Sequence, residues 1–208
     1  MKYILIHGLG QDASSWNETC SALGFDGVRC PDLSSFITNS TCTYANLYKA
    51  LCEFCETEDN KLNLCGLSLG SVLALNYAID YPDRVESLAL IAAQYKMPQM
   101  LLKFQNAVFR LMPKSAFGKM GFQKKDFLSL CGSMATLDFS RSIQSIQCPT
   151  LLICGEKDSA NRNASEELSK RMASANLRVI KNAGHEVNTC AAKELASELC
   201  AFWNETHG

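Results

Sequence analysis

The 208-residue sequence lacks long apolar runs, a marked charge of either sign, and a signal-peptide pattern. No stretch approaches the ~18 consecutive apolar residues of a membrane helix, so we expect no membrane span. The net charge of −1 supplies no general attraction to nucleic acid, so we expect no nucleic-acid partner. The short apolar run Tyr3–Ile6 leads directly into a glycine turn rather than a cleavage site. We therefore expect a cytoplasmic protein, and the sequence does not specify its oligomeric state.

Paired metal-ligand spacings are also absent, although cysteine is abundant. The chain has 11 cysteines, and in a reducing compartment these act mainly as small hydrophobic residues. Cys52 and Cys55 form a C-x-x-C, but no second pair at matching spacing supplies two further ligands. We therefore expect neither a metal site nor a cofactor.

Short apolar runs alternate with stretches of helical periodicity along the chain. This alternation predicts an α/β fold with a doubly wound, mostly parallel sheet of about six strands. The predicted strands are Tyr3–Ile6, Val28–Cys30, Leu62–Cys65, Leu88–Ile91, Thr150–Cys154 and Leu177–Ile180. The predicted helices are Tyr44–Cys55, Ser71–Asp80, Ser165–Ala173 and Ala191–Trp203.

The alternation breaks once, between Met97 and Gln147. This segment holds five of the seven methionines, six of the ten phenylalanines, and seven Lys or Arg against two Asp. It predicts a helical insertion at about 97–147 in a single domain spanning residues 1–208. One interpretation is an amphipathic cap with a solvated basic face. The other is a lid whose Met and Phe line an apolar pocket and whose charge attracts an acidic substrate.

The pentapeptide Gly66-Leu67-Ser68-Leu69-Gly70 lies between a predicted strand and a predicted helix. A serine on such a sharp turn, with glycines two residues away on either side, has the arrangement of a nucleophile elbow. The flanking glycines remove collisions with neighbouring backbone. By itself the pattern arises by chance roughly once in ten chains of this length, so its value depends on finding partners for Ser68.

A serine hydroxyl needs a base, and the chain offers three histidines: His7, His185 and His207. His207 is next to the end of the printed sequence, and His7 ends the first predicted strand. His185 follows the last predicted strand, at the sheet edge where doubly wound folds place their sites. His185 is therefore the candidate base.

The base in turn needs a carboxylate that orients it. Asp158 follows the predicted strand Thr150–Cys154 and is the candidate acid, with Glu156 as its nearest competitor. Asp32 also follows a strand, but one far from His185 in sequence order. The resulting chain order of serine, aspartate and histidine is that of one known triad architecture.

The oxyanion formed by serine attack needs about two N–H donors. The backbone N–H of Leu69 supplies one, at the start of the helix after Ser68. The turn His7-Gly8-Leu9-Gly10 supplies the other through the N–H of Leu9, and His7 shapes that turn. A phosphate-binding turn is the alternative, but the segment lacks the G-x-G-x-x-G pattern.

With these residues in place, the chain resembles the α/β-hydrolase superfamily, in its small lidded esterase-like branch. The resemblance covers nearly the whole chain and implies Ser68 as nucleophile, Asp158 as acid, His185 as base, and Leu9 and Leu69 as oxyanion donors. It also implies a cap over the pocket. Two departures are the missing N-terminal hairpin and the glycine-free stretch 31–36. The motifs that carry the resemblance are His7–Gly10, Gly66–Gly70, Tyr81–Val85, Cys148–Thr150, Gly155–Asp158 and Gly184-His185.

The expected function is hydrolysis of carboxylic esters with small or medium acyl groups, and the expected partner is a small apolar ester or acyl substrate. The alternatives are an acyl transferase or lyase on the same fold, and a non-catalytic protein that binds a small ligand. A serine at position 68 argues against the branches of the superfamily that use a carboxylate nucleophile.

Overall fold

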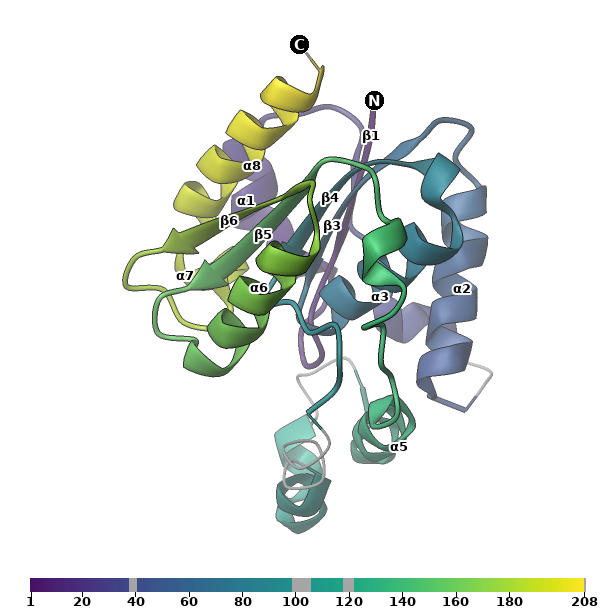
Figure 1. The fold of residues 1–208 in the computed structure, drawn as a ribbon. Helices are drawn as coiled ribbons and strands as arrows, with labels where there is room; N and C mark the ends of the chain where they lie inside the picture. Colours follow the sequence, from purple (N-terminus) through teal and green to yellow (C-terminus); the bar gives the residue numbers. More distant parts are fainter. Residues whose placement is uncertain (38–40, 99–105, 118–121, 208) are drawn as a thin grey trace.

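Six parallel strands form one sheet at the centre of the computed structural model, which describes residues 1–37, 41–98, 106–117 and 122–207 (Figure 1). Across the sheet the order is β2-β1-β3-β4-β5-β6, and every neighbouring pair is parallel. The predicted doubly wound α/β fold is thereby confirmed. The strands are β1 (Lys2–Ile6), β2 (Val28–Arg29), β3 (Leu62–Leu67), β4 (Val85–Ile91), β5 (Thr150–Gly155) and β6 (Ala175–Ile180).

Alternate residues of each strand face opposite sides of the sheet, so the sequence builds two cores. In β1, Tyr3 and Leu5 enter one core, while Ile4 and Ile6 enter the other. The first core is covered by α1 (Asn17–Leu23), α7 (Val187–Cys190) and α8 (Ala192–His207); the second by α2 (Tyr44–Glu56), α3 (Leu69–Asp80) and α6 (Ser159–Arg171). Short 3-10 helices, η1 to η5, span Ala13–Trp16, Leu33–Ile37, Pro82–Arg84, Lys114–Phe117 and Ile143–Ser145.

One predicted boundary is clearly wrong. The expected helix Ser165–Ala173 begins six residues earlier, because α6 starts at Ser159 directly after Asp158. Only Ser165 and Leu168 of this helix are buried, so its first turn carries no apolar periodicity. The early start places polar side chains of α6 next to the candidate acid.

The helical part of the segment between β4 and η5 lies beyond the edge at which the strands end, here called the carboxyl edge (Figure 1). Residues 106–111 are helical and α5 spans Lys124–Met134. Phe109, Phe117 and Phe127 pack edge-on against one another, with ring centroids 5.0 to 5.8 Å apart. The phenylalanines of the predicted insertion therefore pack on one another, and Phe117 and Phe127 belong to the same buried core as α2, α3 and α6. Residues 99–105 and 118–121 of the insertion lie outside the described part of the chain.

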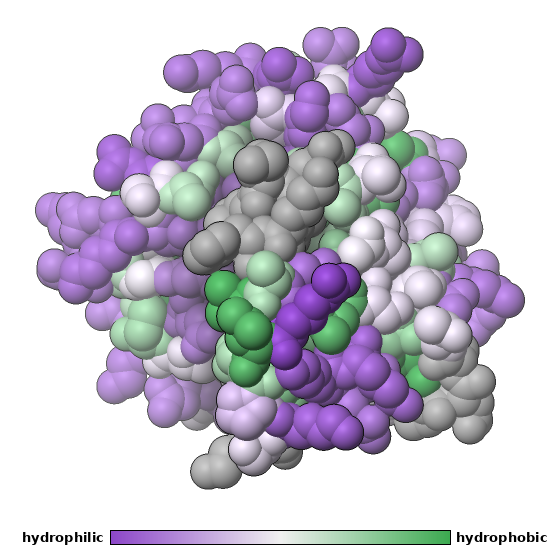
Figure 2. Space-filling model, turned by 90° about the horizontal axis from the view of Figure 1, so that it is seen from below, coloured by the Kyte–Doolittle hydropathy of each residue, from purple (hydrophilic) through white to green (hydrophobic). Residues whose placement is uncertain are grey.

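The outer surface of this segment is mixed in character. Seen from the end at which α5 lies, hydrophobic residues gather near the centre of the face among hydrophilic ones (Figure 2). Leu111 is 88% exposed on the helix 106–111, beside the exposed Arg110. The expected solvated basic face is thus accompanied by exposed apolar side chains. No helix within the described ranges is both long and apolar enough to cross a membrane.

Candidate active site

Ser68 stands on the turn that joins β3 to α3, at the carboxyl edge of the sheet. Its backbone has φ 53° and ψ −110°, a combination that residues other than glycine rarely adopt. The N–H of Ser68 donates to the carbonyl of Ile91 at 2.9 Å, which ties the turn to β4. The turn therefore has the sharp geometry predicted from the pentapeptide, and its backbone is strained.

The two glycines that flank Ser68 are required by close backbone packing. A Cβ atom on Gly66 would lie 2.2 Å from the carbonyl oxygen of Gly70. A Cβ atom on Gly70 would lie 2.1 Å from the carbonyl oxygen of Ile6 in β1. Such distances are far inside van der Waals contact, so the glycines allow α3 to start directly over β1 and β3.

Asp158 and His185 meet at the same edge, after β5 and β6. The distance from His185 Nδ1 to Asp158 Oδ2 is 2.6 Å. Gly155 lets the two loops approach, because a Cβ atom on it would lie 2.1 Å from the carbonyl oxygen of Gly184. The Asp158 side chain is 9% exposed, whereas that of His185 is 41% exposed. The predicted acid and base are thus brought into hydrogen-bond contact across 27 residues of sequence.

The carboxylate of Asp158 is held in its charged form. Burial alone would raise the pKa of Asp158, but hydrogen bonds from His185 and Asn161 outweigh it and bring the pKa below the ordinary 3.8. Asn161 Nδ2 donates to both carboxylate oxygens, each at 2.9 Å. Sequence reasoning missed Asn161, because its place on the first turn of α6 depends on where that helix begins.

A cavity of about 290 Å³ opens beside Ser68 and His185. Leu9, Leu69 and His185 line it together with Ser68, so four of the five predicted site residues share one cavity and Asp158 lies behind His185. Most of the remaining lining is apolar, and part of it comes from the segment after β4. The other lining residues are Val72, Ala92, Gln94, Met97, Pro98, Cys131, Met134 and Asn161.

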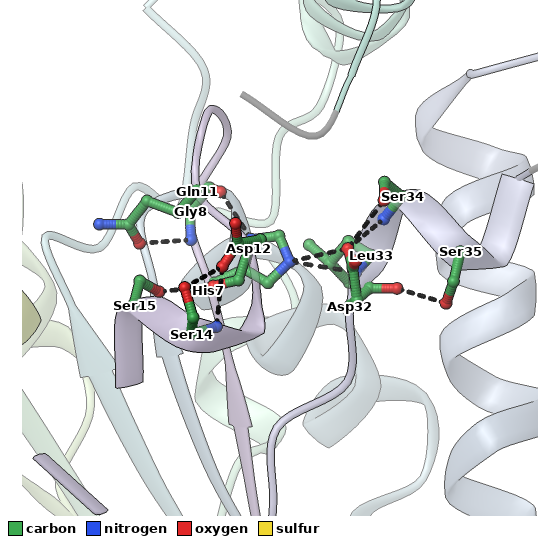
Figure 3. Close-up of polar contacts among 10 residues, drawn as sticks. All are labelled: His7, Gly8, Gln11, Asp12, Ser14, Ser15, Asp32, Leu33, Ser34 and Ser35. Carbon is green, nitrogen blue, oxygen red and sulfur yellow. Dashed lines mark hydrogen bonds and ion pairs between the residues drawn. The ribbon is translucent and has the colours of Figure 1, made fainter. Parts of the chain in front are cut away.

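The turn after β1 is held by His7, which is fully buried (Figure 3). Its Nε2 accepts the N–H of Leu33 at 3.0 Å, so its Nδ1 carries the proton and donates to the Gly8 carbonyl at 2.9 Å. Gly8 N–H in turn donates to Gln11 Oε1 at 3.2 Å. Burial lowers the pKa of His7, and the hydrogen bond to the Gly8 carbonyl and the nearby Asp32 only partly offset this effect. The prediction that His7 shapes the turn is confirmed.

The competing acids and bases lie elsewhere. Glu156 Oε2 accepts the N–H of Asn182 at 2.9 Å, which caps the loop before His185. Asp32 lies 3.7 Å from His7 Nε2. The side chain of His207 is outside the described structure. Within the described ranges, no three His, Cys, Asp or Glu side chains are grouped to hold a metal ion.

A doubly wound parallel sheet with a serine on a strand-to-helix turn is typical of enzymes whose site lies at the carboxyl edge. Residues 3–198 match the model of the alpha/beta hydrolase family, and the chain belongs to this family. The enol-lactonase from Burkholderia xenovorans LB400 is a structural neighbour, with a TM-score of 0.85 and 19% identity over 98% of this chain and 91% of that one. At that identity the likeness concerns the fold.

Two curated relatives match part of the chain. The abhydrolase domain-containing protein abhd-5.2 of Caenorhabditis elegans is 34% identical over 101 residues, which are 42% of this chain and 22% of that protein. The putative 2-succinyl-6-hydroxy-2,4-cyclohexadiene-1-carboxylate synthase of Bacillus subtilis (strain 168) is 25% identical over 167 residues, 62% of this chain and 61% of the relative. The chain thus spans less than two thirds of the length of either relative.

Proposed function

We propose that the protein is a serine hydrolase that cleaves carboxylic esters of small or medium acyl groups through an acyl-enzyme on Ser68. One observation carries the proposal: Ser68 and His185 line one cavity, while His185 Nδ1 lies 2.6 Å from Asp158 Oδ2. The strained backbone of Ser68 supports it, because strain of this kind is retained mainly at functional positions.

In the first half-reaction, Ser68 Oγ attacks the ester carbonyl carbon while His185 Nε2 takes the hydroxyl proton. The carbonyl electron pair moves onto oxygen, and the N–H groups of Leu9 and Leu69 donate to that oxyanion. The pair then returns, the carbon–oxygen bond to the alcohol breaks, and His185 gives the proton to the leaving alkoxide. Asp158 stabilises the charged imidazole throughout.

In the second half-reaction, a water gives its proton to His185 and attacks the acyl carbon. The bond to Ser68 Oγ breaks, and Ser68 regains its proton from His185 while the carboxylic acid leaves. This sequence uses no metal or cofactor.

The size and the lining of the cavity support a substrate with a small or medium, uncharged acyl group. Its volume of about 290 Å³ is near the lower end of the ~300–1,000 Å³ common for ligand cavities. Met97, Cys131 and Met134 supply apolar walls, and all three belong to the segment 97–147 that we propose as a lid in a single domain spanning residues 1–208.

An acyl transferase or lyase is the second candidate, because the B. subtilis relative is named as a putative synthase of a succinyl carboxylate. A substrate with several carboxylates requires cationic partners. Among the described residues that line the cavity there is no Lys or Arg, which favours a neutral ester instead. A protein that only binds a ligand would have no use for the strain at Ser68.

Labelling with a fluorophosphonate probe tests the nucleophile. We expect the wild-type protein to label and the Ser68→Ala variant not to label. Equal labelling of the two proteins would refute the assignment. A panel of p-nitrophenyl esters of increasing chain length then tests the substrate class: we expect turnover highest for short or medium acyl chains, and no turnover on any member would favour the transferase or lyase.

A further inference from the structure

Two amide side chains, Gln94 and Asn161, form a connected pair in the cavity wall next to Asp158. Gln94 follows β4, whereas Asn161 lies on the first turn of α6, directly after the loop that carries Asp158. Gln94 Nε2 donates to Asn161 Oδ1 at 2.8 Å. Asn161 Nδ2 donates to Asp158 Oδ1 and Oδ2 at 2.9 Å and lies 3.2 Å from His185 Nδ1. The pair therefore connects the end of β4 to the candidate acid and base.

We propose that Asn161, oriented by Gln94, is a positioning residue that holds the Asp158 carboxylate in the direction that His185 requires. This inference rests on the proposed roles of Asp158 and His185. It adds a residue that acts through the acid and takes no part in the bond changes.

The Asp158 carboxylate, which only accepts hydrogen bonds, and the Gln94 amide together decide which way the Asn161 amide points. An asparagine amide has an oxygen that accepts and a nitrogen that donates, and the two ends occupy nearly the same space. Because Gln94 Nε2 donates, the Asn161 oxygen must face Gln94 and its NH2 group must face the carboxylate. A flipped Asn161 amide would place its oxygen against the negative charge of Asp158. It would also place its NH2 group against the NH2 group of Gln94.

The contact with both carboxylate oxygens limits rotation of Asp158. A carboxylate held only by His185 can rotate about its Cβ–Cγ bond, which weakens the bond to Nδ1. Asn161 adds two charge-assisted contacts from one donor group, and these favour a single orientation. Asn161 does not titrate, so it orients the acid without competing for the proton.

The test is a double-mutant cycle on turnover of p-nitrophenyl butyrate with the full chain. Asn161→Leu keeps the side-chain shape and removes both amide functions, and we expect kcat to fall by about 10-fold or more with KM unchanged. Gln94→Met removes the anchoring donor, and we expect a smaller fall, about 3-fold or more. Since Gln94 acts through Asn161, the double variant should be no slower than Asn161→Leu alone, within about 2-fold. Asn163→Leu, at an exposed position on the same helix, is the matched control and should leave kcat unchanged.

A second measurement does not depend on turnover. The His185 Nδ1–H proton, identified by its loss in His185→Gln, should give a downfield proton resonance in the wild type because it faces a carboxylate. We expect this resonance to shift upfield or broaden in Asn161→Leu and to persist in Asn163→Leu. Asn161→Ala replaces the leucine variant if the latter does not fold, as judged by its circular dichroism spectrum.

Three outcomes would overturn the inference: an unchanged kcat and resonance in Asn161→Leu, a raised KM with unchanged kcat, or losses that multiply in the double variant. The second would make Asn161 a substrate contact, and the third would separate Gln94 from Asn161. Failure of the proposed function gives a different pattern, because Ser68→Ala would then label like the wild type or Asp158→Asn would retain full turnover.

Discussion

Replacing Ser68 by glycine is expected to leave the folded protein more stable than replacing it by alanine. Both substitutions remove the hydroxyl, so their difference reports only the backbone and the Cβ atom. At φ 53° and ψ −110° an alanine is as strained as the serine. Glycine adopts this conformation freely, because it is the mirror image of an ordinary extended one. The order of stability is therefore the reverse of that found in regular secondary structure.

The size of the difference follows from two opposing effects. Backbone strain at such positions costs about 1–3 kcal/mol, which glycine recovers. Glycine also gives the unfolded chain more freedom, which costs about 0.5–1 kcal/mol relative to alanine. The net expectation is about 1 kcal/mol in favour of Ser68→Gly. For a protein of this size that corresponds to a higher Tm by about 2–4 °C.

Ser71, three residues further along, supplies the matched control. It lies inside α3 and is buried, and its hydroxyl oxygen lies 2.6 Å from each of the carbonyl oxygens of Gly66 and Ile91, which share its single proton. Alanine and glycine both lose these bonds, so at Ser71 alanine should be the more stable by about 1 kcal/mol. Urea unfolding of the four variants measures both differences. If alanine is the more stable residue at both positions, the turn at Ser68 is not strained in solution and the argument is wrong.

Three other substitutions and conditions test the site and its support. Gly70→Ala should cost about 3 kcal/mol or more, because its Cβ atom would meet the β1 backbone. Gly132→Ala, inside α5, should be neutral or stabilising, because the nearest atom to its Cβ would be Asn106 Nδ2 at 4.0 Å; urea unfolding distinguishes the two variants. Asp158→Asn should lower kcat on p-nitrophenyl esters by about 10³–10⁴-fold, while Glu156→Gln should change it little, and the reverse result would reassign the acid. Because burial lowers the pKa of His7 below 6.5, the unfolded chain binds a proton that the folded protein does not. The contribution of His7 to the free energy of unfolding should therefore be full above about pH 6.5 and fall as the pH drops below it. This dependence should weaken in His7→Gln when unfolding is followed from about pH 7 to pH 5.

The strands and the serine turn could be predicted because their signals are local. Apolar runs of the right length predicted all six strands to within a few residues. The glycines at 66 and 70 predicted the turn, and the backbone contacts that a Cβ would make there explain why no other residue fits. Asp158 and His185 could be chosen because the ends of parallel strands share one edge of the sheet.

Other features depend on packing between distant segments. The sequence at the start of α6 has no apolar periodicity that would predict a helix. The reason is that only later residues of α6, Ser165 and Leu168, reach the core. The role of Asn161 could not be predicted because the start of this helix is not visible in the sequence. In addition, its partners Gln94 and Asp158 come from the ends of two different strands. The packing of the insertion after β4 could not be predicted either, because its phenylalanines contact one another and join a core built from distant segments of the chain.

By itself the sequence determined the order of the strands, the sharp turn at Ser68 and the choice of a candidate acid and a candidate base. Each of these is set by neighbours along the chain or by a rule of parallel sheets. Only the tertiary structure decided that Asp158 and His185 touch, and that Leu9 and Leu69 border one cavity with Ser68. It also decided that Asn161 donates to Asp158 and accepts from Gln94. These contacts join residues from separate loops, and their distances depend on how closely the loop backbones pack, as at Gly155 and Gly184.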